Sequence, residues 1–115
     1  MNYLEILEKC RAVIADPDKW TQGVGARDCH GQAVHPSSPD AVRWCAAGVI
    51  QTLALLSGHE WARLLRKLSA GWDRMVVEVN DELGHEAVLV MYDRAIANER
   101  VRNMDPSLRV SYYEN

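Results

Sequence analysis

Apolar residues recur three or four positions apart in three separate segments of the chain. These segments are residues 2–15, 57–70 and 84–98. This spacing places the apolar side chains on one face of a helix. Asn2 with Glu5, and Ser57 with Glu60, stand in the spacing of a capping box, and Gly71 is a typical C-terminal stop. The pattern therefore predicts three amphipathic helices.

A fourth apolar segment, residues 38–56, has the pattern of a buried helix. Its Ser-Pro-Asp start at Ser38 supplies an N-cap, a proline for the first helical position and a carboxylate for the first turn. From Trp44 onward only Gln51 and Thr52 are clearly polar, so the helix would be apolar on most of its circumference. We therefore expect a central buried helix that begins at the Ser-Pro-Asp start.

Two shorter segments do not follow a clear helical pattern. Residues 20–34 contain two short extended runs with Gly31 between them, which predicts a small β-hairpin. Residues 72–79 are ambiguous, because their β-branched side chains favour a strand whereas their apolar positions also fit one helical stripe. The expected fold is mainly α (α+β), a single domain over residues 1–115 with four or five helices around the buried central helix and a small β-hairpin.

Charge and cysteine content narrow the classes of protein to which the chain can belong. The 115 residues include 13 Lys and Arg and 16 Asp and Glu, a net charge of −3, so neither nucleic acid nor a membrane surface is an expected partner. No uncharged run is long enough to span a bilayer. The three cysteines show no CxxC spacing, and the chain start lacks the pattern of a signal peptide. We expect a reduced, cytoplasmic protein.

Several short sequence words occur together in a distinctive order. They are Trp20-x-Gln22-Gly23, Ala26-Arg27-Asp28-x-x-Gly31, Ala41-Val42-Arg43-Trp44-Cys45-Ala46-x-Gly48, Asn80-Asp81, Val88-Leu89 and Asp93-Arg94-Ala95-Ile96. As a set they resemble a family of short bacterial and phage proteins that is classed only as a domain of unknown function. The resemblance covers about residues 4–97 and implies a compact, mainly helical domain. It implies no activity, because that family has no established catalytic residues.

Cys45 is the strongest candidate for a catalytic residue. A cysteine at a helix start can be ionised by the helix dipole and a nearby histidine, as in cysteine-dependent hydrolases and transferases. The available histidines are His30, His35, His59 and His85, and the set that we retain as the alternative is Cys45, His85 and Asp81. Cys45 lies six residues after Pro39, however, and the dipole effect is confined to the first turn. We therefore expect a buried, inert thiol.

The cysteines, histidines and acidic residues give little indication of a metal site. Cys29, His30, His35 and Cys45 lack the paired spacing of a structural zinc site, and neighbouring residues on a strand point to opposite faces. The acidic residues near Asp81 lack the alternating pattern of a calcium loop. We expect no metal and no other cofactor.

Two polar pairs and the C-terminal tail are the candidate binding residues. Arg27-Asp28 lies in the predicted hairpin and Asn80-Asp81 precedes the last helix. A structural role, capping or charge pairing, is the simpler interpretation, but the two loops could line one pocket if they share an end of the domain. In the tail, residues 100–115, Tyr112 and Tyr113 stand in or beside an alternating run typical of an edge strand.

These features together favour binding over catalysis. We expect a non-catalytic binding or regulatory protein with an unidentified protein partner, such as a phage or mobile-element accessory protein. The tail would contribute to that surface or to a homodimer, because exposed strand edges recruit a neighbouring chain.

Overall fold

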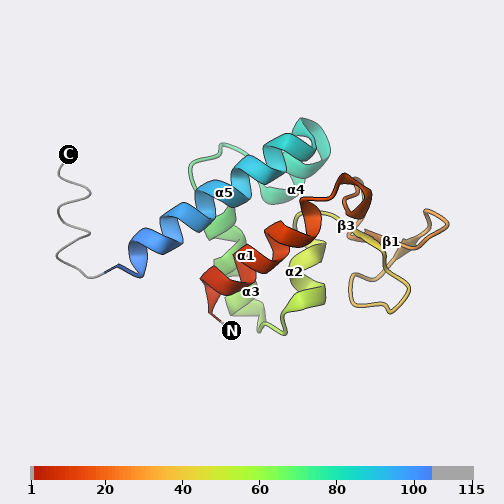
Figure 1. The fold of residues 1–115 in the computed structure, drawn as a ribbon, viewed down its shortest axis with the longest axis horizontal. Helices are drawn as coiled ribbons and strands as arrows, with labels where there is room; N and C mark the ends of the chain where they lie inside the picture. Colours follow the sequence, from red (N-terminus) through yellow and green to blue (C-terminus); the bar gives the residue numbers. More distant parts are fainter. Residues whose placement is uncertain (1, 105–115) are drawn as a thin grey trace.

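Five α-helices and a small sheet make up residues 2–104, the part of the chain that the computed structural model describes (Figure 1). The α-helices are α1 (Tyr3–Ile14), α2 (Gly48–Leu53), α3 (Gly58–Leu68), α4 (Val76–Glu78) and α5 (His85–Arg102). Two shorter turns are the 3-10 helix η1 (Pro17–Lys19) and the π-helix η2 (Val79–Leu83). The strands are β1 (Ala26–Arg27), β2 (Ala33–Val34) and β3 (Arg43–Trp44). The predicted α+β class with mainly helical content is confirmed.

The three amphipathic helices form where their spacing predicts them. The Asn2 side chain accepts a hydrogen bond from the Glu5 amide at the start of α1, and Ser57 and Glu60 form the complete capping box of α3. Gly71 follows α3 with φ +86°, the left-handed conformation that glycine adopts at low cost. The last helix, α5, continues to Arg102, beyond its expected end near residue 98.

The predicted central helix over 38–56 is wrong over its first ten residues. Ser38 accepts a hydrogen bond from the Asp40 amide in a turn, and β3 then pairs with β1. Helix α2 begins only at Gly48, and the Cys45 amide donates to the Gly25 carbonyl at 3.0 Å. The pairing of β3 with β1 therefore outweighs the local helix-start signal at Ser38. Helix propensity is weak, and contacts with distant parts of the chain often override it.

The sheet has the antiparallel order β2-β1-β3. Ala26 pairs with both Val34 and Trp44, so β1 is the central strand. The predicted hairpin is β1-β2, and its turn includes Gly31 at φ +80°. The third strand was not expected, because its sequence resembles the start of a helix.

The ambiguous segment 72–79 becomes helical. Val76–Glu78 forms α4 and continues directly into the π-helix η2, which ends at Gly84 with φ +94°. A π-helical turn is rare and often occurs at functional sites. It brings Asn80 to a buried position, with 0% of its surface exposed.

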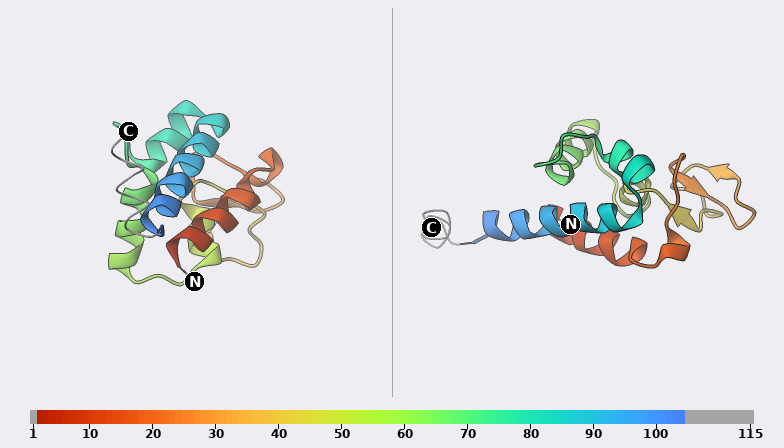
Figure 2. Two further views of the ribbon diagram at one scale, coloured as in Figure 1. Left: turned by 60° about the vertical axis from the view of Figure 1, so that its left-hand side comes forward. Right: turned by 90° about the horizontal axis from the view of Figure 1, so that it is seen from above.

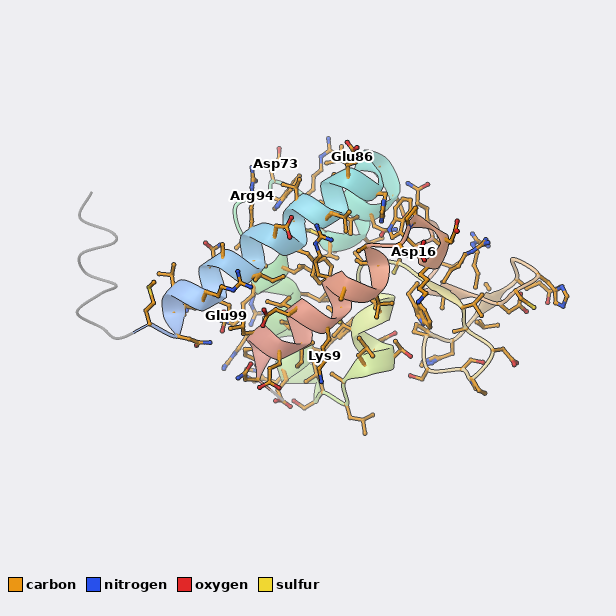
Figure 3. All side chains as sticks on the ribbon, in the orientation of Figure 1. Lys9, Asp16, Asp73, Glu86, Arg94 and Glu99 are labelled. Atoms are coloured by element: carbon orange, nitrogen blue, oxygen red, sulfur yellow. The ribbon has the colours of Figure 1, made fainter. Side chains whose placement is uncertain are left out.

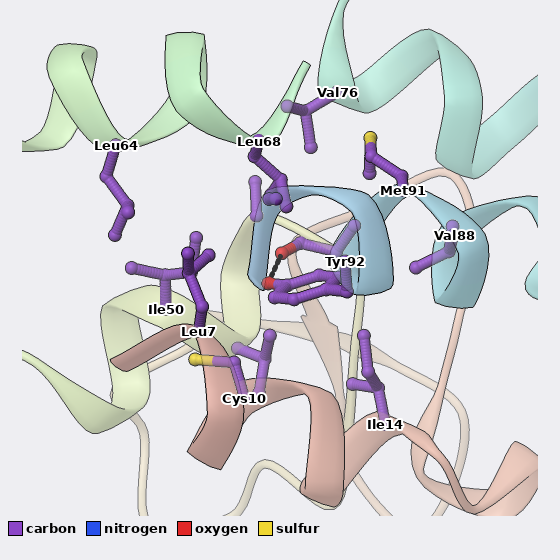
Figure 4. Packing of buried hydrophobic residues seen from close by; sticks show 14 of the residues in the cluster. Leu7, Cys10, Ile14, Ile50, Leu64, Leu68, Val76, Val88, Met91 and Tyr92 are labelled. Atoms are coloured by element: carbon purple, nitrogen blue, oxygen red, sulfur yellow. Dashed lines mark hydrogen bonds between the residues drawn. The ribbon is translucent and has the colours of Figure 1, made fainter. Parts of the chain in front are cut away.

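The core lies between α1 and α5, which pack side by side, with α2 against α1 and α3 against α5. Tyr92 of α5 is fully buried at its centre and donates a hydrogen bond of 2.6 Å to the Ala46 carbonyl (Figure 4). The sheet lies at one end of the molecule (Figure 2). Charged side chains such as Lys9 and Arg94 cover the outer faces of α1 and α5 (Figure 3).

Two further predictions concern membrane-spanning helices and the C-terminal tail, residues 100–115. Among the described residues no helix is long and apolar enough to cross a membrane. The expected edge strand with Tyr112 and Tyr113 lies outside the described residues, so it stays a prediction.

Candidate functional site

The Asn80 side chain joins the sheet end of the molecule to the helices. Its Oδ1 accepts hydrogen bonds from the indole nitrogen of Trp20 at 2.7 Å and from the amide of Ala46 at 2.9 Å. Its Nδ2 donates to the Thr21 carbonyl at 3.0 Å and to Asp81 Oδ1 at 2.9 Å. All four hydrogen-bonding positions of this buried amide are therefore satisfied, and its role is structural.

Asp81 continues this network toward the loop that precedes β1. Its Oδ1 accepts from the Gly23 amide at 2.9 Å, and the Gln22 side chain donates to the carbonyls of Asn80 and Asp81 at 3.0 and 3.3 Å. The structure thus brings the loops around residues 20–36 and 80–84 to one end of the domain. The sequence analysis considered that these two loops share an end of the domain, but it named none of the hydrogen bonds that join them.

Arg27 and Asp28 hold the shape of the hairpin. The Arg27 guanidinium donates to Thr21 Oγ1 and to the carbonyls of Gln22 and Gly31, at 2.9 to 3.0 Å. Asp28 Oδ1 accepts from two amides of the following turn at 2.9 Å each. Arg27 therefore bonds to uncharged oxygens of its own hairpin, in place of the carboxylate that sequence reasoning favoured.

A cavity of about 230 Å³ opens where the sheet, α2, α3 and η2 meet. We call it the junction cavity. Its lining residues are Gly23, Val24, Gly25, Cys45, Ala47, Gly48, Gln51, Trp61, Val77, Asn80 and Asp81. Of the predicted binding residues, Asn80 and Asp81 line it, whereas Arg27 and Asp28 do not. Five of the lining residues belong to the sequence words by which the family was recognised: Gly23, Cys45, Gly48, Asn80 and Asp81.

Two further hollows adjoin the junction cavity. The α2-α3 hollow, about 260 Å³, shares Gln51 and Trp61 with it and is also lined by Leu55 and Leu56. The α3-α4 hollow, about 190 Å³, shares Ala47 and Val77 with it. Its other lining residues are Leu65, Arg66, Ser69, Met75 and Val76. Because each of these two hollows shares two lining residues with the junction cavity, we call the three hollows together the trough.

Trp61 and Gln51 were not expected at a site. Trp61 lies on the apolar stripe of α3, where it is partly buried against the core and also lines two hollows. Gln51 is an exposed polar residue within an otherwise apolar segment. That polar exception was the one signal in the sequence that could have marked this face as open.

Cys45 lies at the N-terminal side of α2, three residues before its first residue, and not inside a helix as expected. The Gly48 amide donates to its Sγ at 3.2 Å. Burial raises the pKa of the thiol, and the charge of Asp81 raises it further, although the amides of Gly48 and Ala47 act in the opposite sense. The thiol is therefore held in its neutral form by burial, and not by depth within a helix.

The residues of the alternative catalytic set are only partly together. Cys45 and Asp81 line the junction cavity, but its lining includes no histidine. The Nε2 atom of His85 instead lies 2.6 Å from the Ile14 carbonyl oxygen, and its ring packs against that of Trp20 in a tilted arrangement, with 5.0 Å between the ring centroids. Among the described residues, the histidine that lines an adjoining hollow is His35, in the α2-α3 hollow, so no histidine lies beside Cys45 in the junction cavity itself.

The three thiols are expected to react at very different rates with iodoacetamide. Cys29 is exposed in the hairpin turn, whereas Cys10 and Cys45 are buried and burial raises the pKa of Cys10 to about 12. Brief labelling of the native protein at neutral pH, followed by mass-spectrometric peptide mapping, should modify Cys29 first. Preferential labelling of Cys45 would support the enzyme alternative, and equal labelling of all three after denaturation is the control.

Metal ligation has no support from the arrangement of side chains. Within residues 2–104 no group of three or more His, Cys, Asp or Glu side chains lies close enough together to hold an ion.

Comparison with known families accounts for most of the chain. A model described as a family of unknown function, DUF6197, matches residues 1–98, a range that includes every residue of the Asn80 network and of the trough. Comparisons with curated proteins and with solved structures gave no match. The chain therefore belongs to DUF6197, a family of unknown function.

Proposed function

We propose that this domain is a non-catalytic binding protein that holds an apolar segment of a partner protein in the trough. The observation that carries the proposal is the set of three hollows beside α2, α3 and α4, which share lining residues. Each hollow is smaller than the roughly 300–1,000 Å³ typical of pockets for drug-sized ligands or cofactors. A set of small hollows suits the successive side chains of a bound polypeptide.

The rim of the trough supports the same function. Leu55, Met75 and Val77 are large apolar residues with exposed side chains, and each lines one or two of the hollows. Exposed apolar groups that gather around a concave surface are typical of protein-binding sites. Asp81 is the one acidic residue among the lining residues of these hollows, which favours a partner segment that carries a basic residue.

The alternative, a cysteine-dependent hydrolase or transferase, has weaker support. Such an enzyme needs a thiolate and a base within hydrogen-bond reach of it. Here burial raises the pKa of Cys45, and within residues 2–104 no histidine lines the junction cavity.

Selection from a library of short random peptides tests the proposal directly. We expect the wild-type domain to enrich peptides rich in apolar residues, and Val77→Asp to lose them, because a carboxylate would stand between the junction cavity and the α3-α4 hollow. Val90→Asp is the matched control, since Val90 is exposed to a similar extent, 44% against 51%, but does not line the trough.

Binding of each selected peptide would be measured by fluorescence anisotropy with all three proteins, after thermal melts confirm that they fold. Peptides that bind wild type and Val90→Asp, but bind Val77→Asp at least about tenfold more weakly, support the proposal. Failure to select any peptide, or equal binding to all three proteins, would overturn it.

A further inference from the structure

We infer that the junction cavity takes a basic side chain, lysine or arginine, from the bound segment, with its cationic end beside Asp81 and its methylene stem against Trp61. This inference rests on the proposed function and names the residue type that would give the trough its specificity. It is carried by the position of Asp81, by the apolar walls of the cavity and by the size of the cavity.

Asp81 is a fixed carboxylate without a counter-ion. Its Oδ1 accepts hydrogen bonds from the Gly23 amide and from Asn80 Nδ2, both at 2.9 Å, and this holds the group in one orientation. Within residues 2–104 no lysine or arginine forms an ion pair with it. By contrast, neighbouring Glu82 is paired with Arg74. A preoriented carboxylate that lines a cavity can bind a cation at little cost in side-chain entropy.

The walls of the cavity suit the rest of a basic side chain. Trp61 offers an aromatic surface, and Ala47, Val77 and the chain at Gly48 offer apolar surface with little bulk. Lysine and arginine carry methylene stems that pack on such surfaces, and their cationic ends are attracted to an indole face. Asp81 is itself exposed, so its attraction to a cation acts through solvent and is sensitive to salt.

Other occupants fit the same observations less well. An anionic side chain would be repelled by Asp81, and a neutral polar side chain would gain only a hydrogen bond to it, without the attraction between opposite charges. A metal ion would need several more oxygen or sulfur ligands than one carboxylate and one neutral thiol supply. A basic side chain uses both the charge and the apolar walls.

Small probes can test this inference on the full chain without a known partner. Amide chemical shifts would be followed in ¹H-¹⁵N spectra during titration with n-butylammonium, n-butanol and n-butyrate, which share one alkyl stem and differ in charge. We expect n-butylammonium to shift the amides of Gly23 and Gly48 and to bind roughly tenfold more tightly than n-butanol, with n-butyrate weakest. The preference should fall as salt is added.

Two substitutions distinguish the effect of the Asp81 charge from the effect of the protein's overall negative charge. Asp81→Asn retains Oδ1 as an acceptor for Gly23 and removes the charge, so it should abolish the preference for n-butylammonium while n-butanol still binds. Asp73→Asn removes an exposed charge that is not among the lining residues of the trough and should leave the preference intact.

The two proposals can fail separately. Equal binding of n-butylammonium and n-butanol, no shift with any probe, or a preference that survives in Asp81→Asn would overturn the inference about the basic side chain. Peptide selection that depends on Val77 would still support the trough in those cases. Selected peptides that depend on Val77 but contain no lysine or arginine would overturn the inference alone.

Discussion

Replacing Gly48 by alanine is expected to destabilise the fold strongly. A Cβ atom at this position would lie 2.0 Å from the Gly25 carbonyl oxygen and 2.9 Å from its carbonyl carbon, both of which are backbone atoms. The backbone of β1 and the start of α2 would have to separate, which breaks the bond from the Cys45 amide to that carbonyl. We expect a loss of about 3 kcal/mol or more in the free energy of unfolding, against a total of roughly 5–15 kcal/mol for a domain.

Gly58→Ala is the matched control for this substitution. Gly58 is the first residue of α3, and a Cβ there would meet no atom within 4 Å. Because alanine is the better helix former, this variant should be as stable as wild type or slightly more stable. Urea unfolding followed by circular dichroism compares the three proteins. A Gly48→Ala protein with a transition close to that of wild type would contradict the close approach of the two backbones.

Replacing Asn80 by alanine should cost roughly 4 kcal/mol of unfolding free energy. It would leave the Trp20 indole N–H and the Ala46 amide without their acceptor, and the Thr21 carbonyl without a donor. Each buried group left unsatisfied costs about 1–3 kcal/mol, and the cavity adds to this. The same urea experiment measures the effect, and the quenching of tryptophan fluorescence reports on Trp20 and its surroundings.

Two other substitutions sharpen this test. Asn98→Ala changes the same residue type on the exposed face of α5 and should have little effect. Asn80→Asp keeps the shape but places a carboxylate against the Thr21 carbonyl and Asp81, where a donor is needed. It can donate only when protonated, so its deficit relative to wild type should be smaller in mildly acidic buffer than at neutral pH. A loss below about 1 kcal/mol in Asn80→Ala would show that the network does not bear on stability.

The helices that were predicted well are those whose signals are local. The capping box at Ser57, the cap at Asn2 and the stop at Gly71 each act within a few residues, and apolar periodicity extends over the whole element. The Gly31 turn of the hairpin is local in the same sense. These elements could be read from the sequence because each is stabilised by its own neighbours.

The prediction failed where distant residues decide the structure. Residues 38–47 carry good helix-start chemistry, yet β3 pairs with a strand that begins seventeen residues earlier, at Ala26. The site shows the same difficulty, since Asn80 contacts groups 34 to 60 residues away in sequence. The sequence marks Asn80 and Asp81 as a polar pair, but the cavity that they line follows from contacts that no local pattern encodes.

Because Asn80 holds the loops of the sheet in place, its late position in the sequence affects the order in which the protein acquires its structure during synthesis. The strands are two residues long, too short to be stable by themselves, and their loops are tied down by side chains that the ribosome adds about 35 to 60 residues later. Residues 20–46 are therefore synthesised before the residues that hold them. Their full set of native contacts can form only after η2 and Tyr92 of α5 have been made, when nearly the whole domain has been synthesised.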